Sequence, residues 1–347
     1  MSMDETLTKW YNKNKRSLPW RDTKDPYTIW ISEIILQQTR IDQGTPYFIK
    51  FIKTFPNISA LANAKEDKVL HLWQGLGYYS RARNLHFTAR YIYNELNGDF
   101  PNNYNDIIKL KGIGEYTAAA IASFCFKEKV AAIDGNVFRV ITRLFDINKP
   151  IDKSIGKKEV VDICNELIPA DKPDEFNQAI MDFGATICTP KSPKCSDCIL
   201  SAKCLSKKNN TFLHRPVKSI RTKQKDRYFT YLVLYDNNDT IICKRSKNDI
   251  WKELYEFPLI ESDDELTMEE LKQNTHFREL IVNEKILELK VTKVKPHILS
   301  HQKIMSTFIT IHTEKIKNDT NTKTSLKSLK NYAFPVLISN FINSNLN

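Results

Sequence analysis

The chain has 347 residues, of which 41% are hydrophobic and 27% charged, a composition typical of folded globular proteins and unlike that of disordered ones. Its length allows two domains, and its formal net charge of +11 favours polyanionic partners such as nucleic acid. The first residues lack a signal-peptide pattern, and no run of about 18 apolar residues occurs. We therefore expect a soluble, cytoplasmic protein that does not associate with a membrane.

Residues 1–204 show helical periodicity throughout, in amphipathic segments such as 46–55, 66–76 and 83–96 that are separated by short breaks with Pro, Asn or Gly. This pattern predicts an all-α first domain. One of its segments, WISEIILQQT at residues 30–39, reads as buried helix and carries a single charged residue, Glu33, near its start. A helical period places Glu33 on a face that should be covered, and burial there would raise its pKa. A buried arginine partner, or a helix rotated to expose Glu33, is the structural alternative.

Two further segments of this domain carry candidate binding or catalytic residues. Gly112 and Gly114 separate two helical runs, the second of which is predicted to start at about Glu115. Backbone amides at such a turn can bind a phosphate, although a plain tight turn has the same pattern. Asp134 precedes a helix predicted to start near Asn136, where it could cap the helix or face a cleft. Two carboxylates in different environments are what cleavage of an N-glycosidic bond needs.

Four of the seven cysteines fall close together with the spacing C-x6-C-x2-C-x5-C, at Cys188, Cys195, Cys198 and Cys204. In a reducing compartment a dense cysteine set indicates a metal site before a disulfide framework. Four thiolates suit either tetrahedral zinc or a 4Fe-4S cluster. The single CxxC pair favours iron–sulfur without excluding zinc.

After the cysteines the sequence changes character. Residues 205–227 contain eight Lys or Arg and one acid, a net charge of +7, which predicts a basic linker. Two β-branched and aromatic runs then flank an Asp-Asn-Asn-Asp turn at residues 236–239, a hairpin pattern. Helical stretches are predicted around 266–274 and 325–342. Residues 228–347 should therefore form a smaller α+β domain.

Seven motifs, in this order along the chain, resemble those of the helix-hairpin-helix DNA glycosylases with a 4Fe-4S loop, and more narrowly the MutY family of adenine DNA glycosylases. They are LPWR (18–21), SEIILQQT (32–39), WQGLGYYSRARNL (73–85), LKGIGEYTAAAI (110–121), IDGNVFRV (133–140), FNQAIMDFGATIC (176–188) and the four-cysteine loop. The resemblance covers nearly the whole chain. It implies a catalytic domain at 1–204, with the iron–sulfur loop at 188–204, a linker at 205–227 and a Nudix-like domain at 228–347.

The resemblance also implies an activity, the removal of adenine mispaired with 8-oxoguanine or guanine in duplex DNA during base excision repair, after extrusion of the base into a pocket. Glu33 would protonate the adenine, and Asp134 would stabilise the oxocarbenium-like sugar, with Asn136 and Tyr116 completing the pocket. Related bifunctional enzymes carry a Schiff-base lysine where this chain has Tyr116, so we expect a monofunctional enzyme that leaves an abasic site.

Residues that contact DNA follow from the same resemblance. Gln38 and Tyr78 are similar to residues that wedge into the duplex beside the lesion, and Gly112 and Gly114 would form the phosphate-binding hairpin. The four cysteines would hold a structural 4Fe-4S cluster. We expect a monomer that binds duplex DNA in the nucleoid.

In the second domain, Ser300 and His301 would read 8-oxoguanine, and Leu299 stands where the family has Phe. Leucine cannot stack on a base as an aromatic ring does. RELIVNEK, at residues 278–285, lacks the glycine and paired glutamates of a working Nudix hydrolase, so nucleotide hydrolysis is not expected.

Three other interpretations remain open at this stage. A thymine-mismatch glycosylase or a glycosylase with lyase activity could share the scaffold, although Tyr116 argues against the lyase. A non-catalytic DNA-binding iron–sulfur protein would bind duplex with a steep salt dependence and leave every base in place.

Overall fold

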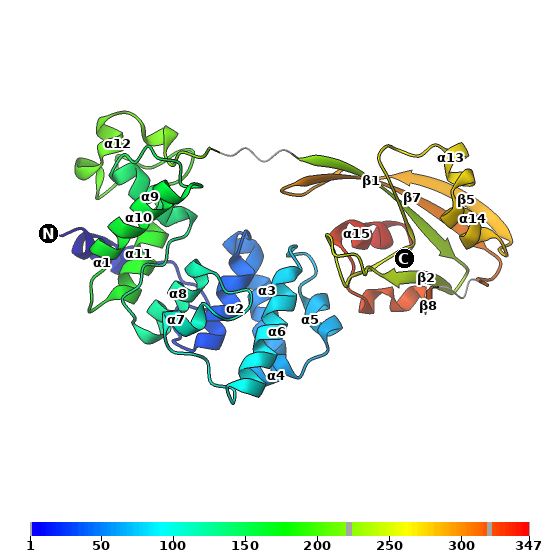
Figure 1. Cartoon of the computed structure of the whole chain (residues 1–347), viewed down its shortest axis with the longest axis horizontal. Helices are drawn as coiled ribbons and strands as arrows, with labels where there is room; N and C mark the ends of the chain where they lie inside the picture. The colour runs from blue at the N-terminus through cyan, green and yellow to red at the C-terminus, as the bar shows by residue number, and fades with distance from the viewer. Residues whose placement is uncertain (1, 220–223, 318–320, 347) are drawn as a thin grey trace. The chain divides into compact units, whose positions relative to one another are not determined.

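The computed structural model describes residues 2–219, 224–317 and 321–346. Its contacts divide the chain into two compact units, residues 1–64 with 83–221 and residues 65–82 with 222–347. The first unit is helical and the second contains a β-sheet, which confirms the predicted fold class (Figure 1). No helix within these described ranges has the length and apolar character needed to cross a membrane.

The helices of the first unit follow one another with short connections. They are α1 (Met3–Asn14), α2 (Pro26–Leu36), α3 (Ile41–Thr54), α4 (Ile58–Ala62), α6 (Ser80–Glu95), α7 (Tyr104–Ile107), α8 (Glu115–Phe126), α9 (Gly135–Leu144), α10 (Ser154–Leu167), α11 (Pro173–Thr186), α12 (Leu205–Lys208) and the 3-10 turns η1 (Ser201–Lys203) and η2 (Phe212–His214). Helix α5 (Glu66–Leu72) and the first residues of α6 fall within the second unit.

Helix α2 begins sharply and is covered on every side. The Asp25 side chain caps it by accepting hydrogen bonds from the amides of Tyr27 (3.3 Å) and Thr28 (2.9 Å), and Pro26 occupies the first turn, where its missing N–H costs nothing. Every residue from Ile29 to Ile35 is buried. A helix that is apolar all round has no solvent face, so the predicted alternative of a Glu33 turned towards water is wrong.

A second core lies where α1, α9, α10 and α11 meet, and its buried residues include Leu7, Val140, Val160, Ile180 and Phe183. Asn177, on α11, is 1% exposed and connects this core to α8. Its side-chain amide donates to Ser123 Oγ (2.8 Å) and to the Val130 carbonyl (2.9 Å), and its oxygen accepts from the Ala132 amide (3.0 Å). These bonds fix the chain segment that leads to Asp134.

The described residues of the second unit form an eight-stranded sheet whose central pair, β1 (Lys225–Tyr235) and β7 (Gln302–Thr313), is parallel. The main strand order is β3-β2-β1-β7-β5, with β4, β6 and β8 paired to β1, β7 and β2. The remaining bounds are β2 (Asp239–Lys244), β3 (Tyr255–Glu256), β4 (Leu259–Ser262), β5 (Ile286–Lys293), β6 (His297–Ile298) and β8 (Thr322–Ser325). The predicted hairpin is confirmed, since β1 and β2 are antiparallel and the Asp236 carboxylate accepts from the amides of Asn238 (2.9 Å) and Asp239 (2.8 Å).

Both faces of this sheet are covered by helices. Alternate residues of β1 point to opposite faces: Tyr231 and Val233 belong to one core with residues of α15 (Val336–Asn345), and Leu232 and Leu234 belong to another with residues of α13 (Met268–Gln273) and α14 (Thr275–Ile281). The helical stretch predicted at 325–342 is divided, because Pro335 starts α15 and a 3-10 turn, η3 (Leu326–Asn331), precedes it.

The segment predicted as a linker, 205–227, is partly structured. Helix α12 and the η2 turn occupy its first half, where the Asn209 side chain donates to Asp146 Oδ2 (2.8 Å) and Thr211 donates to the same carboxylate at 2.5 Å. Strand β1 already begins at Lys225. Residues 220–223 of this segment lie outside the described residues.

Candidate functional site

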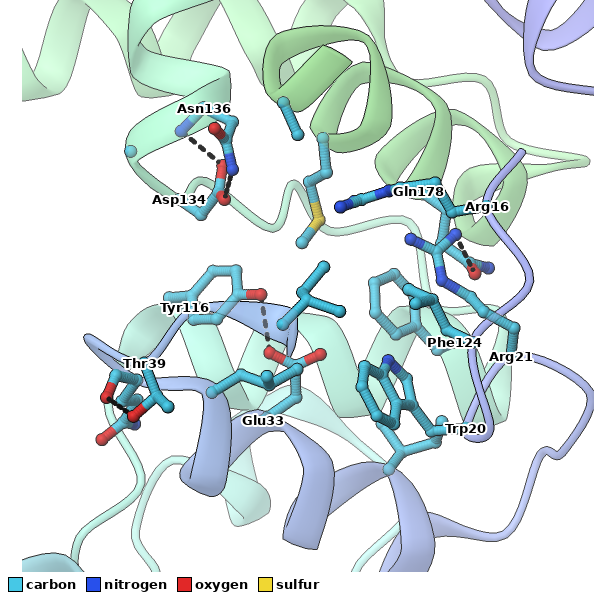
Figure 2. Close-up of a pocket in the computed structure, with 18 of the residues that line it drawn as sticks. Arg16, Trp20, Arg21, Glu33, Thr39, Tyr116, Phe124, Asp134, Asn136 and Gln178 are labelled. Atoms are coloured by element: carbon cyan, nitrogen blue, oxygen red, sulfur yellow. Dashed lines mark hydrogen bonds between the residues drawn. The ribbon is translucent and has the colours of Figure 1, made fainter. Parts of the chain in front are cut away.

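The first unit contains a cavity of about 1340 Å³ that opens between α2, α8, the start of α9 and α11 (Figure 2). The four residues predicted to be catalytic all line it, namely Glu33, Tyr116, Asp134 and Asn136. They come from three helices and the loop before α9, so the cavity exists only in the folded chain. Gln38 also lines the cavity, and its side chain is exposed.

Glu33 projects from α2 into the cavity and is 7% exposed. Its Oε2 accepts a hydrogen bond of 2.6 Å from the Tyr116 hydroxyl. Burial raises the pKa of Glu33 from its ordinary value of 4.5 to about 7, opposed by the Tyr116 hydrogen bond and the Arg21 charge and reinforced by the charge of Asp134. The carboxyl group is therefore poised to hold a proton near neutral pH.

The predicted alternative of an arginine paired with Glu33 does not hold in the described part of the chain. The nearby Arg21 instead donates to Asp182 Oδ1 (2.8 Å) and to Gln178 Oε1 (2.9 Å). Asp182 is fully buried, and Arg16 donates to the same carboxylate. Arg21 therefore forms its ion pair with Asp182, and its charge lowers the pKa of Glu33 less than burial raises it.

Tyr116 lies in the first turn of α8, directly after the Gly112–Gly114 turn. Burial is the main cause that raises the pKa of Tyr116 well above its ordinary value, and the neighbouring Glu33 and Asp134 add to it. The hydroxyl therefore stays protonated and donates to Glu33 Oε2. Figure 2 shows this bond at the centre of the cavity.

Asp134 caps α9 and faces the cavity at the same time, so the two interpretations of its sequence position are compatible. Its Oδ1 accepts from the amides of Asn136 and Val137, both at 2.8 Å, and its Oδ2 accepts from the Asn136 side-chain amide at 2.6 Å. Burial raises the pKa of Asp134, while these three N–H donors oppose the rise. Glu33 has one hydroxyl donor, whereas Asp134 has three N–H donors that favour its charged form.

Two arginines of α9, which sequence reasoning did not single out, connect this site to the cysteine loop. The Arg139 guanidinium donates to Asn136 Oδ1 (2.8 Å), to the Gly184 carbonyl (2.6 Å) and to the Cys188 carbonyl (2.6 Å). One turn further on, Arg143 donates to carbonyls of the loop at Thr189 (2.7 Å) and Pro190 (2.8 Å). The sequence signal was available, since FRVITR places two arginines four residues apart on an otherwise apolar helix.

The four loop cysteines are free thiols of intermediate burial. Burial raises the pKa of the Cys198 thiol to about 11, and the other three thiols, which interact with it electrostatically, add to the rise. Cys188, Cys198 and Cys204 pack against the core of α9 and α11, and the Arg143 guanidinium donates to Cys188 Sγ at 3.4 Å.

Within the described ranges, no three His, Cys, Asp or Glu side chains are grouped tightly enough to surround one ion. The four cysteine sulfurs of a 4Fe-4S cluster lie farther apart than the ligands of a single ion, because each thiolate binds a different iron. Four thiols on one loop supply the number of ligands that either a 4Fe-4S cluster or a zinc ion needs.

The residues predicted to contact DNA are exposed and several have unusual backbone. Gln38 has φ of 56° and Tyr78 has φ of 45°, in the left-handed region that side chains with Cβ rarely adopt. Gly112 has φ of 82°, and a Cβ there would lie 2.5 Å from Asn84 Cβ, so only glycine fits. Gly114 caps α8 and is exposed.

Within the second unit, Ser300 and His301 are exposed in the turn between β6 and β7. The hydroxyls of Ser300 and Tyr78 are hydrogen-bonded, so the structure brings together two of the predicted DNA contacts. Leu299 is partly buried against the core beneath α15. Its amide donates to the Gln302 carbonyl at 2.8 Å, which closes the turn.

Comparisons with known proteins agree with this geometry. Residues 31–169 match the family described as HhH-GPD superfamily base excision DNA repair protein, and residues 230–344 match the NUDIX domain family. The adenine DNA glycosylase of Buchnera aphidicola subsp. Baizongia pistaciae is 40% identical over 287 residues, which cover 81% of this chain and 80% of that protein. The adenine DNA glycosylase of Homo sapiens is 38% identical over 208 residues, 57% of this chain and 38% of that protein.

Among solved structures, a thermostable thymine-DNA glycosylase is 31% identical with a TM-score of 0.55, covering 59% of this chain and 95% of that chain. A non-covalent endonuclease III–DNA complex, 20% identical with a TM-score of 0.52 over 60% of this chain and 94% of that chain, shares the fold. The extent of the match to the Buchnera protein decides the narrower assignment, and this chain belongs to the adenine DNA glycosylase family.

Proposed function

We propose that this protein is a DNA glycosylase of base excision repair that removes adenine from duplex DNA, and that its substrate is adenine opposite 8-oxoguanine or guanine. Family membership supports the adenine chemistry. The observation that carries the mechanism is the buried Glu33 carboxyl group, whose pKa of about 7 suits a general acid at neutral pH.

The acid step begins with an adenine extruded from the duplex into the cavity. Glu33 donates its proton to the five-membered ring of the purine, the glycosidic bond between C1′ and N9 breaks, and the electron pair leaves with adenine. The sugar becomes an oxocarbenium-like cation. Water then adds to C1′ and its proton passes to the Glu33 carboxylate, which restores the acid.

Asp134 stabilises the sugar cation in this proposal. Three N–H donors from Asn136 and Val137 favour the ionised carboxylate and fix its direction. Arg139 holds the Asn136 side chain in turn, so the negative charge is oriented before substrate arrives.

Tyr116 decides between the monofunctional and lyase pathways. Its hydroxyl donates to Glu33, and it has no amine with which to form a Schiff base. The product is therefore an abasic site in an intact strand.

A 4Fe-4S cluster bound by Cys188, Cys195, Cys198 and Cys204 would tie the 188–204 loop together as a structural cross-link. Arg139 and Arg143 fix the loop carbonyls to α9. Iron analysis of protein purified without oxygen should give about four irons per chain; stoichiometric zinc in their place would contradict this assignment.

We further propose that Gln38 and Tyr78 enter the duplex beside the lesion and that the Gly112–Gly114 turn binds a backbone phosphate. Left-handed backbone at both wedge residues supports this role, because such strain gathers at functional positions. Ser300 and His301 would contact the base opposite adenine. The proposed domain division is catalytic at 1–204, linker at 205–227 and base-recognising at 228–347, with the protein acting as a monomer.

The test is a single-turnover reaction on an end-labelled duplex with one adenine opposite 8-oxoguanine, analysed with and without hot alkali. Strand breaks at the adenine only after alkali would support a monofunctional adenine glycosylase. A duplex with thymine opposite guanine is the matched control, since a thymine-DNA glycosylase shares the scaffold. Tight binding without any alkali-labile site would instead support a non-catalytic DNA-binding protein.

A further inference from the structure

The Gly112–Gly114 turn is supported by one face of α6. Asn84 and Thr88 lie one helical turn apart on this face, and both touch the turn. The Thr88 hydroxyl donates to the Lys111 carbonyl (2.8 Å), and Asn84 occupies the space that a Cβ at residue 112 would need. Contacts from α6 thus help to hold the turn in place between α7 and α8.

Phe87 lies on the same face and supports the side chain of Lys111. The Lys111 Nζ lies 4.2 Å from the centre of the Phe87 ring, within the range of a cation–π interaction. Phe87 is 52% exposed, so the face of its ring is open to the lysine side chain. The ring restrains the ammonium group, and Lys111 remains exposed.

Other basic groups near this turn are paired with carboxylates. Lys109 Nζ lies 2.8 Å from Asp106 Oδ1, and Lys157 on α10 pairs with Glu115, the first residue of α8. Lys111 is exposed and has no ion pair within residues 2–219, 224–317 and 321–346. Its charge is therefore available to a ligand from outside the chain.

We propose that Lys111 is a further DNA-phosphate contact and that Phe87 is the residue that positions it. The inference rests on the proposed function, in which the amides of the turn bind a backbone phosphate. An ammonium held one residue before Gly112 adds a full positive charge beside those amides. A phosphate there gains a Coulomb contact without any reading of base sequence.

The test measures binding of the full chain to an undamaged duplex by fluorescence anisotropy over a series of salt concentrations. Without a mispair no excision is involved, so failure of this inference is separate from failure of the glycosylase assignment. Lys111→Met should lower the slope of log affinity against log salt by about 0.9, which is a loss of roughly eightfold at 0.1 M salt. An unchanged slope would overturn the contact.

Two further variants make the interpretation specific. Lys109→Met removes the same charge two residues away, but from a lysine already paired with Asp106, so it should change the slope much less. An equal loss would show a general charge effect and overturn the proposal. Phe87→Leu should weaken binding in the wild-type background and have no further effect beside Lys111→Met; equal losses in both backgrounds would refute the positioning role.

Discussion

The cavity around Glu33 and the turn that carries Ser300 place polar side chains in opposite surroundings. Glu33 is 7% exposed on a helix buried on all sides, whereas Ser300 and His301 are exposed between two strands. Burial gives Glu33 a pKa of about 7. A carboxyl group that donates a proton near neutral pH needs a buried site that raises its pKa. A residue that contacts a base needs an exposed surface that the base can reach.

The largest effect should come from removing the acidic proton of Glu33 while keeping the shape of its side chain. Glu33→Gln should lower the single-turnover excision rate on adenine opposite 8-oxoguanine by about 10²- to 10⁴-fold, the range of general-acid catalysis. Duplex affinity should stay within about twofold, because the amide fills the same space. Glu166→Gln, at an exposed carboxylate on α10, is the matched control. A Glu33→Gln protein that kept most of its rate would remove Glu33 from the mechanism.

The pH dependence tests the same buried carboxyl group without mutation. The acid must be protonated, and its pKa in the folded protein is about 7, so the rate should be highest below pH 7. Above that value the rate should fall about tenfold per pH unit as the proton is lost. Rates are measured at saturating protein, with duplex binding followed at each pH to separate affinity from chemistry. A rate that is level from pH 6 to pH 9 would contradict the assignment.

The exposed turn should give a smaller and different effect. Ser300→Ala removes a hydroxyl that now bonds to Tyr78. If Ser300 contacts the damaged base, the ratio of excision rates for adenine opposite 8-oxoguanine and opposite guanine should fall about two- to tenfold, the value of one hydrogen bond. Ser246→Ala, at another exposed serine of the same unit, should leave that ratio unchanged. Equal slowing on both duplexes would mean that Ser300 only supports the turn.

The sequence was sufficient to predict those features that depend on local pattern. Helical periodicity predicted the burial of Glu33, and the β-branched and aromatic runs on either side of the turn at 236–239 predicted the β1–β2 hairpin. Asp134 was recognised as both a possible cap and a possible cleft residue, and its geometry satisfies both. In each case the pattern that predicts the feature lies in residues close together in the chain.

Features that depend on distant partners were not predicted. Arg139 donates to carbonyls of Gly184 and Cys188, which lie 45 and 49 residues away, and no local pattern shows where a buried guanidinium will find its acceptors. The left-handed backbone at Gln38 and Tyr78 is likewise imposed by the surrounding fold, since neither residue favours it. Pro335 could have revealed the break in the helix predicted at 325–342.

The smallest effect should come from the hydroxyl that bonds to Glu33, and its sign is informative. The Tyr116 hydrogen bond lowers the pKa of Glu33, so Tyr116→Phe should raise that pKa above about 7. The loss of rate at high pH should then begin at a higher pH, by less than about one unit, while the rate at low pH changes only a few-fold. The full pH–rate profile of the variant checks this against wild type. A shift to lower pH would show that the hydroxyl favours the protonated acid, and the balance of burial and hydrogen bonding assigned to this site would be reversed.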